Sequence, residues 1–444
     1  MASHMMAHGG GGTRCRAREF QRRRGVLSGG LRIAVIGAGV SGLTAAWTLA
    51  ARHDVLLFER ESRLGGHAHT HEVAVDGRSV PVDTGFMVFN TRTYPHFVAM
   101  LDALGVESRP SDMSFSVRCD RCDVEYSSAG VRGLFARPRQ AFTTPHLAML
   151  ADIRRFFRAG RAALADGSAV GQSLGAFLDA HRFGAEVIRH FVLPMGGAIW
   201  SASSRTMREF PAASYLRFLD NHGLLAASGQ PVWRTIVGGS RSYVQRIAAR
   251  LGDGVRVGHP VTRVDRTAAG AVVSAAGLAP IAVDAVVVAT HADEALALLG
   301  DASPDERAAL GAFRYSVNPT VLHGDARWLP VTPAARASWN VRMPDCRDEQ
   351  RPVTVTYDLA RLQGLDAAPM LCTLNGDDFA APVHARMTYA HPILDAAAID
   401  AQPRVAALNG RRHTYFCGAH LRYGFHEDGV MSALAAVERL EATA

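Results

Sequence analysis

The sequence predicts an α/β fold in which a parallel-sheet domain, assembled from separate stretches of the chain, is interleaved with an α+β domain. The first observation is a hydrophobic segment, Leu31–Ile36, that runs directly into Gly37-Ala-Gly39-Val-Ser-Gly42. The second is a hydrophobic strand, Val55–Phe58, that ends at the acidic residue Glu59, 17 positions after Gly42. A strand, a glycine turn, a helix and a second strand ending in a carboxylate are typical of a Rossmann-like, dinucleotide-binding unit.

Each glycine of this turn has a separate physical task. Gly37 permits the tight turn, Gly39 lets the backbone approach a pyrophosphate, and Gly42 lets the helix pack closely on the strand. The N-terminus of the helix then faces the phosphates, and Glu59 can accept hydrogen bonds from ribose hydroxyls.

Further motifs follow in a fixed order along the chain. They are Arg63-Leu-Gly-Gly-His67, Val82-Asp-Thr-Gly-Phe86, Asp284–His291, Tyr415–Gly418 and Gly424–Gly429. This order resembles the FAD-dependent amine oxidase and phytoene desaturase superfamily. The resemblance implies an FAD-binding domain of the amine-oxidase (GR2) type. It also implies these FAD-contacting residues: Gly37, Gly39, Ser41, Gly42, Glu59, Arg60, Gly65, Gly66, His67, Thr84, Gly85, Phe86, Val261, Ala289, Thr290, Gly418, Gly429, Val430 and Met431.

Other segments give a narrower resemblance, to bacterial flavoproteins encoded beside cyclopropane-fatty-acid-synthase-like methyltransferases. The segments are Pro81–Asn90, Pro110–Ser116, Leu193–Ser201, Asp220–Leu225 and Gly424–Gly429. By association, this resemblance implies a hydrophobic, fatty-acyl or lipid substrate. It also implies a methyltransferase as a partner.

Composition supports a large globular chain with two interleaved domains. The chain has 444 residues, of which 48% are hydrophobic, enough for a substantial core. We assign 31–90, 232–298 and 408–444 to the FAD-binding domain. We assign 91–231 and 299–407 to the substrate domain, with helices expected at 94–104, 145–164 and 173–192.

The net charge of +7 does not indicate a nucleic-acid-binding surface. Residues 1–32 carry seven arginines and one glutamate, so +6 lies in this stretch and about +1 in the rest of the chain. We interpret 1–30 as a tag and a disordered Arg/Gly-rich tail. Arg22-Arg-Arg24 resembles an export signal, but the glycine motif occupies the apolar stretch that such a signal requires.

The sequence predicts a cytoplasmic protein without a membrane-spanning helix. Six scattered cysteines suit a reducing compartment, and the chain has no apolar run of about 18 residues. Segment 145–164 combines apolar residues on one face with Arg154, Arg158 and Arg161. We interpret it either as an amphipathic helix packed on the core or as a peripheral contact with the inner face of the membrane.

The chain contains no lysine, so all 48 basic Lys/Arg positions are arginine. A lysine Schiff base and a lysine general base are therefore excluded. Many amine oxidases of the resembling superfamily place a lysine near the flavin. Its absence argues against ordinary amine oxidation.

The residues that we expect to carry catalysis are His426, Glu427 and His222. His426 follows the aromatic Phe425 in the segment that the resemblance places at the flavin ring, and an imidazole can exchange a proton near neutral pH. The alternative is that His426 and Glu427 pair with each other and brace the loop. His222 is either a substrate-side base or part of a turn with Asp220 and Asn221.

Two other patterns could bind a metal, but we predict no metal site. His67, His69 and His71 alternate, as on one face of a strand, yet no fourth ligand is evident. Cys119-Asp-Arg-Cys122 is a single CxxC within an apparent hairpin, and zinc normally needs a second pair, so we favour a simple turn. Asp112 is expected to cap a turn.

We therefore expect an FAD-dependent oxidoreductase that acts on a hydrophobic, fatty-acyl substrate by desaturation, saturation or isomerisation. One alternative is a flavin amine oxidase that acts on a small amine. Another is a non-catalytic flavoprotein that assists a lipid methyltransferase.

Overall fold

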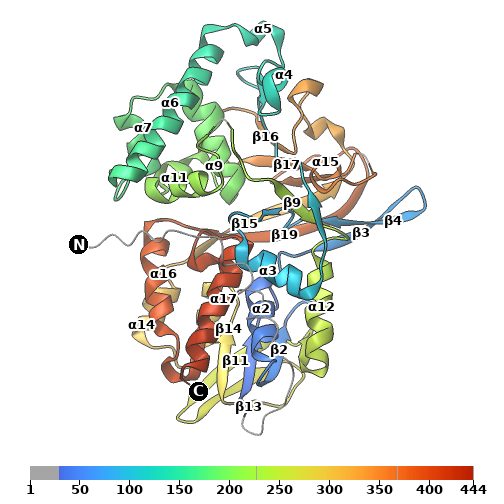
Figure 1. Ribbon diagram of the computed structural model, residues 1–444, viewed down its shortest axis with the longest axis vertical. Helices are drawn as coiled ribbons and strands as arrows, with labels where there is room; N and C mark the ends of the chain where they lie inside the picture. The colour runs from blue at the N-terminus through green and yellow to red at the C-terminus, as the bar shows by residue number, and fades with distance from the viewer. Residues whose placement is uncertain (1–29, 227, 368, 444) are drawn as a thin grey trace.

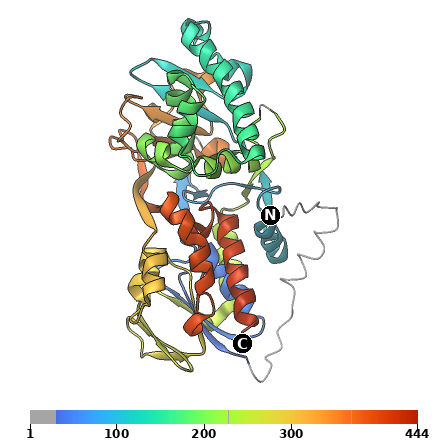
Figure 2. The ribbon, with the colours of Figure 1, turned by 90° about the vertical axis from the view of Figure 1, so that its left-hand side faces the viewer.

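The computed structural model describes residues 30–226, 228–367 and 369–443, and these form two lobes (Figure 1). The predicted tail at 1–29 lies outside the described residues. The lower lobe in Figure 1 contains the predicted dinucleotide-binding unit, and the upper lobe contains a second sheet with a layer of helices. The side view in Figure 2 shows the same elongated arrangement.

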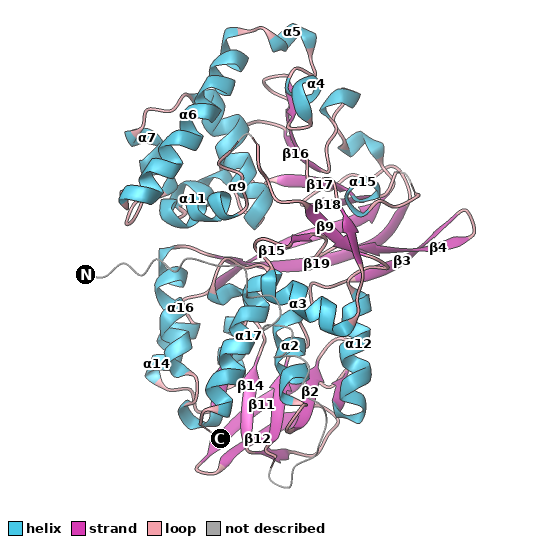
Figure 3. Cartoon of the chain, in the orientation of Figure 1, coloured by secondary structure: helices cyan, strands magenta, loops and turns pink. Residues whose placement is uncertain are grey.

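The lower lobe is built on a five-stranded parallel sheet with the order β10-β2-β1-β14-β20. Its strands come from the three segments that the sequence assigns to FAD binding. One face of the sheet is covered by helices (Figure 3). The strands are β1 (Arg32–Ile36), β2 (Asp54–Glu59), β10 (Val255–Val257), β14 (Ala285–Val288) and β20 (Thr414–Phe416), and the helices are α2 (Val40–Leu49), α3 (Pro95–Leu104), α12 (Arg241–Leu251) and α17 (His426–Glu441).

The other face of this sheet packs against a small antiparallel sheet and three helices. Alternate residues of β1 serve the two faces: Ile33 and Val35 lie in one core, and Ala34 and Ile36 in the other. The second core is completed by β11 (Val261–Thr267), β12 (Gly270–Ala275), β13 (Ile281–Val283), α13 (Ala292–Leu298), α14 (Pro304–Leu310) and α16 (Ala396–Leu408).

This packing corrects one predicted domain boundary. The sequence assigns 299–407 to the substrate domain, but Ala309 of α14 and Val405 of α16 lie in the same core as Val286 of the nucleotide sheet. Both helices bury their apolar faces in the core of the lower lobe. They therefore belong to the FAD-binding domain and not to the substrate domain.

The upper lobe contains a seven-stranded sheet with the order β19-β15-β18-β17-β16-β7-β8. The two longest strands, β15 and β19, pair antiparallel from Arg314↔Ile393 to His323↔Val383, and in Figure 1 they lie between the lobes. The strands are β7 (Phe115–Cys119), β8 (Val124–Ser127), β15 (Arg314–His323), β16 (Trp339–Met343), β17 (Thr354–Asp358), β18 (Leu371–Leu374) and β19 (Val383–Ile393).

Helices complete the upper lobe, and one of them differs from expectation. The predicted helix at 145–164 is α6 (Thr144–Asp166). The predicted single helix at 173–192 is instead interrupted, because Arg182 adopts a left-handed φ of 51° and the chain turns before Gly184. The pieces are α7 (Leu174–Ala180), α8 (Ala185–Val187) and the π-helical segment η1 (Ile188–Val192), followed by α9 (Leu193–Trp200), α10 (Ser204–Glu209) and α11 (Ala212–Asn221).

Short elements connect the two lobes. A hairpin of β3 (Thr70–Val75) and β4 (Arg78–Asp83) extends from the junction (Figure 1). Other short elements are β5 (Phe89–Asn90), β6 (Ser108–Pro110), β9 (Trp233–Ile236) and α15 (Leu359–Gln363). Helices α4 (Gly130–Leu134) and α5 (Pro138–Ala141) lie at the top of the upper lobe in Figure 1. Among the helices of the described residues, none has the length and hydrophobicity needed to cross a membrane.

Candidate active site

The glycine turn has the geometry of a pyrophosphate cradle. Gly37 has a φ of +95° and donates its N–H to the Phe58 carbonyl at 2.8 Å. A Cβ on Gly42 would lie 1.8 Å from the Gly37 carbonyl oxygen, so the helix and turn require a glycine there. A Cβ on Gly39 would meet no protein atom within 4 Å. The open space beside Gly39 therefore lies at the N-terminus of α2, where phosphates bind.

Glu59 closes one side of this turn. Its Oε2 accepts the Ala38 N–H at 2.8 Å, and its Oε1 accepts the Glu61 N–H at 3.0 Å. Each carboxylate oxygen retains a second lone pair, and Glu59 lines the cavity described next. Arg60 also lines that cavity, with its guanidinium held 2.6 Å from Glu294.

A single cavity of about 1510 Å³ begins at the glycine turn and continues into the upper lobe. Ordinary ligand pockets have volumes of about 300–1,000 Å³, so this cavity has room for a dinucleotide together with a substrate. Most of the predicted FAD contacts line it: Gly37, Gly39, Ser41, Glu59, Arg60, Gly66, His67, Gly85, Phe86, Val261, Ala289, Thr290 and Gly418.

Four other predicted FAD contacts shape the cavity without lining it. Besides Gly42, Gly65 is needed because a Cβ there would lie 2.4 Å from the Ala68 carbonyl oxygen. Thr84 is buried, with its hydroxyl 2.7 Å from that of Tyr389. A Cβ on Gly429 would lie 2.7 Å from Val40 Cγ1. Gly429 therefore allows α17 to pack directly against α2.

Val430 and Met431, which the resemblance places at the cofactor, do not line the cavity. Helix α17 begins at His426, and its first helical hydrogen bond joins the Gly429 N–H to the Phe425 carbonyl at 3.0 Å. The amides of Val430 and Met431 therefore lie inside the helical ladder. The amides at the N-terminus of α17 that are free of this ladder belong to His426, Glu427 and Asp428.

A cluster of neutral imidazoles lies midway along the cavity. The His67 ring lies 5.1 Å from that of Tyr389, 5.3 Å from that of His391 and 6.4 Å from that of His291, measured between centroids. Burial lowers the pKa of His67 well below its ordinary value and that of His391 to about 4. Motif analysis did not find His391, because no local pattern around it in β19 signals a site.

His67 also provides a test of cofactor fit. Its Nε2 is buried and has no hydrogen-bond partner in the structure. A buried polar atom without a partner costs about 1–3 kcal/mol. A cofactor with polar ring atoms would satisfy it. Together with the open space at Gly39, this atom shows that the residues of the cavity suit FAD.

His426 lines the cavity but does not have the predicted acid–base character. Its ring stacks on Phe86 with centroids 3.5 Å apart, and its Nε2 lies 3.3 Å from the Tyr243 hydroxyl. Burial lowers the pKa of His426 to about 3. The expectation of proton exchange near neutral pH is therefore wrong, because the imidazole remains neutral there.

Glu427 is a structural residue rather than a catalytic one. Its carboxylate accepts the backbone N–H groups of His96 at 3.0 Å and Phe97 at 2.9 Å, and it lies 2.7 Å from His96 Nδ1. These amides form the first turn of α3, where a carboxylate is stabilising. The alternative prediction, that Glu427 pairs with His426, is also wrong, because the Glu427 carboxylate caps α3 instead.

His222 lines the cavity, but the turn predicted with Asp220 and Asn221 is wrong, because both residues belong to helix α11. His222 ends α11, where its Nδ1 lies 2.9 Å from the Phe218 carbonyl. Its ring stacks on Phe218 at 4.0 Å, and burial lowers its pKa to about 4. His222 is therefore a neutral imidazole at the substrate side of the cavity.

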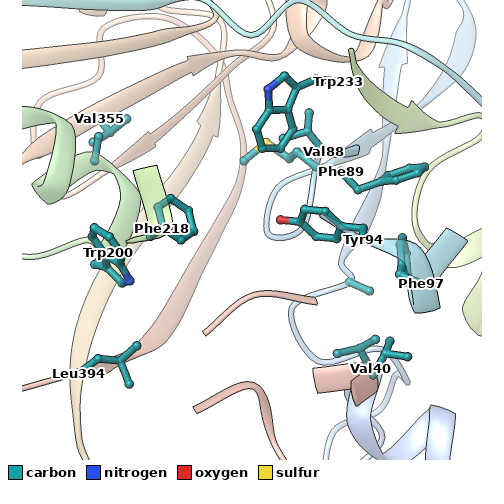
Figure 4. Close-up of a cluster of buried hydrophobic side chains, with 14 of the residues drawn as sticks. Val40, Val88, Phe89, Tyr94, Phe97, Trp200, Phe218, Trp233, Val355 and Leu394 are labelled. Carbon is teal, nitrogen blue, oxygen red and sulfur yellow. The ribbon is translucent and has the colours of Figure 1, made fainter. Parts of the chain in front are cut away.

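The upper part of the cavity is lined mainly by apolar side chains, and we call it the apolar lobe of the cavity, as distinct from the two lobes of the protein. Figure 4 shows Trp200 and Phe218 on one side of a space and Tyr94 and Trp233 on the other, and all four line the cavity. The lobe continues along α6 and α9, where its lining includes Leu150, Ile153, Phe157, Phe191, Met195 and Ile199.

Charged groups are few in the apolar lobe. Arg154 of α6 and Arg386 of β19 are exposed and line the cavity. Asp112 is the carboxylate on this side, and one of its oxygens accepts hydrogen bonds from Ser114 and Ser338. It therefore caps a turn, as predicted, and also borders the cavity.

The chain belongs to the flavin containing amine oxidoreductase family, whose profile matches residues 40–323. "Putative flavin-containing monoamine oxidase AofH" of Mycobacterium tuberculosis is 30% identical over 254 residues. That match covers 54% of this chain and 53% of AofH, so it spans about half the length of this relative. Membership of this family makes FAD the expected cofactor of the chain.

Solved structures show the same fold. The CLA-producing fatty acid isomerase from P. acnes is 17% identical, with a TM-score of 0.66 over 92% of this chain and 98% of that one. Wild-type putrescine oxidase bound to putrescine is 14% identical, with a TM-score of 0.64 over 93% of this chain and 98% of that one. At these identities the likeness concerns the fold alone. The predicted methyltransferase partner stays a prediction.

Proposed function

We propose that this chain catalyses FAD-dependent redox chemistry on a fatty-acyl substrate. The reaction would remove or deliver a hydride at a carbon beside a double bond or a methyl branch. The observation that carries the proposal is the continuity of the cavity, from the glycine cradle past the neutral imidazoles into an apolar lobe. FAD, when bound, supplies the hydride acceptor or donor.

The side chains of the lobe would bind and orient an acyl chain. Phe218 and Phe425 stack with centroids 4.7 Å apart, and both line the cavity close to His222. Such a wall buries methylene groups at about 0.8 kcal/mol each and excludes water from the reacting carbon. The lowered pKa values of His222 and His426 keep both imidazoles neutral, so they can hydrogen-bond but act only as weak bases.

Arg154 supplies a site for the acyl carboxylate. It lies on α6 between the cavity-lining residues Ile153 and Phe157, and it forms no ion pair with another described residue. An arginine fork can bind a carboxylate through two hydrogen bonds. A substrate with an apolar chain and an anionic end therefore matches this part of the cavity.

Amine oxidation is the second candidate, because the family profile and AofH both bear that description. A protonated amine would need a carboxylate or an electron-rich ring as its partner. Asp112 already accepts hydrogen bonds from Ser114 and Ser338, and the chain has no lysine. Rings of the lining such as Trp200 and Trp233 could meet an amine, so the preference for the acyl substrate rests on the occupied Asp112 carboxylate and the absence of lysine.

The proposal extends to contact with a lipid surface at the N-terminal end of α6. Val131, Phe142 and Leu147 are 72%, 82% and 44% exposed, and Val131 lines the cavity. Exposed apolar groups beside the arginines of α6 are the combination that inserts at an anionic membrane.

A matched pair of variants tests this contact. Val131→Ser should weaken co-sedimentation with vesicles of anionic phospholipid. Val170→Ser should not, although Val170 is 70% exposed, because it lies beyond the other end of the 23-residue α6. Equal binding by both variants would contradict a membrane contact at this end.

Product analysis tests the reaction itself. The FAD-loaded protein is incubated with unsaturated and methyl-branched fatty acids, and the number and position of double bonds are determined by gas chromatography and mass spectrometry. A changed double bond supports the proposal. Turnover of small amines with peroxide formation, and none of fatty acids, would replace it with the second candidate.

A further inference from the structure

Three cysteines and one histidine from separate parts of the chain meet at one end of the upper sheet. Cys119 and Cys122 belong to the β7–β8 hairpin, Cys346 follows β16, and His190 lies in η1. Their three sulfur atoms and one imidazole nitrogen all lie within 4.8 Å of one another. The Cys122 and Cys346 sulfurs are 3.5 Å apart.

Strand pairing brings the cysteine segments together. Strands β7 and β16 are parallel neighbours, with Cys119 opposite Met343. Beyond the strand ends, the Asp120 N–H still donates to the Met343 carbonyl at 2.9 Å and the Arg121 N–H to the Pro344 carbonyl at 3.1 Å. The two loops therefore leave the sheet side by side. The hairpin turn expected at Cys119–Cys122 is present, but its sulfurs acquire partners that are distant in sequence.

His190 is arranged as a ligand rather than as a packed side chain. It is 1% exposed, and its buried Nε2 has no hydrogen-bond partner. Its Nδ1 lies 3.0 Å from Glu186 Oε2. Metal-binding histidines usually donate their second ring N–H to a carboxylate in this way. The π-helical geometry of Ile188–Val192 is itself rare and is most often found at functional sites.

We propose that Cys119, Cys122, Cys346 and His190 bind a structural Zn²⁺ ion. Zinc takes four such ligands in a tetrahedron, with bonds of about 2.3 Å to sulfur and 2.0–2.1 Å to nitrogen, which places the sulfurs about 3.8 Å apart. The cluster needs only small shifts to reach this geometry, because the Cys122 and Cys346 sulfurs are 3.5 Å apart and all four ligand atoms lie within 4.8 Å of one another. Thiolates and imidazole exclude Mg²⁺ and Ca²⁺, and four protein ligands leave no open position for catalysis.

The site would hold part of the wall of the apolar lobe. His190 precedes Phe191, which lines the cavity, and the Tyr126 hydroxyl donates to the His190 carbonyl at 2.8 Å. Zinc would join the β7–β8 hairpin, η1 and the loop after β16, which are far apart in the sequence. Its loss should therefore loosen the upper lobe and leave the glycine cradle of the lower lobe intact.

Metal analysis of the full chain, purified without chelators, tests the site. We expect about one zinc per chain by plasma mass spectrometry. Cys122→Ser and Cys346→Ser should lose it, and Cys372→Ala should retain it, because Cys372 is buried in β18 away from the cluster. Glu186→Gln should weaken zinc binding about 10–100-fold, as expected for a residue that positions a ligand.

Cobalt titration of the wild-type chain keeps the test decisive even if a cysteine variant does not fold. After zinc removal, Co²⁺ should produce thiolate charge-transfer bands and the visible bands of a tetrahedral site. Failure of the apo chain to bind either metal would overturn the proposal. A disulfide between Cys122 and Cys346 in freshly purified protein, found by mass spectrometry, would also overturn it.

Discussion

Gly39 and Gly42 differ by three positions, yet they should respond to alanine in different ways. Gly39 has φ −69° and ψ −178°, which any residue can adopt, and a Cβ there meets no protein atom within 4 Å. Gly39→Ala should therefore fold normally, with a change in unfolding free energy of no more than about 1 kcal/mol, because the loss of a glycine N-cap opposes the gain from a less flexible unfolded chain. Gly42→Ala should be destabilised, because its Cβ would lie 1.8 Å from the Gly37 carbonyl oxygen.

The open space beside Gly39 also determines how Gly39→Ala should affect FAD binding. If the pyrophosphate occupies the cradle, the added methyl group overpacks it at a cost of about 1–3 kcal/mol. That cost corresponds to a Kd for FAD that is about 5–150-fold higher. The assay is a titration of the apoprotein with FAD, followed by flavin fluorescence, alongside thermal unfolding of each variant. A stable Gly39→Ala protein with the wild-type Kd would refute the assignment of the cradle.

Further predictions concern the substrate, stability and pH. Arg154→Ala should raise the KM for a free fatty acid about tenfold, and Arg158→Ala, on the same helix outside the cavity lining, should leave it unchanged; equal effects would argue against a carboxylate site. Glu427→Gln should lower the free energy of unfolding in urea by about 1.5–3 kcal/mol, because it weakens a charged cap, and the exposed Glu438→Gln should have little effect. Burial lowers the pKa of His222 and His391 to about 4 and that of His426 to about 3. Below pH ~6.5 the unfolded chain therefore binds more protons than the folded chain. The free energy of unfolding should fall as the pH is lowered from ~6.5 toward ~4. Replacing His426 with Phe should flatten that dependence, and an unchanged slope would contradict the assignment.

The sequence predicted the parts of the site that depend on local backbone geometry. The glycine turn, the β2 carboxylate and the Gly65–Gly66 loop each require particular residue types at fixed spacing, so motifs identify them. The β7–β8 hairpin follows from a local pattern in the same way.

The sequence could not predict contacts between distant segments. Glu427 caps helix α3 by accepting the N–H of His96, which lies 331 positions earlier in the chain, and nothing near either residue signals this. Cys122 meets Cys346 across 224 positions, so a single CxxC motif gives no sign of additional ligands. Nor does the sequence reveal the role of Gly429, which lies inside α17 rather than at its start and whose small size serves packing against Val40.

Anaerobic reduction of the bound flavin tests the central claim most directly. The FAD-loaded protein is titrated with unsaturated fatty acid or membrane lipid extract and, separately, with a panel of small amines, and the flavin absorbance is followed. The proposed function predicts that a fatty-acyl compound bleaches the oxidised flavin if the reaction removes a hydride, or reoxidises the chemically reduced flavin if it delivers one, and that amines do neither. Bleaching by amines alone would contradict it and would identify the chain as an amine oxidase.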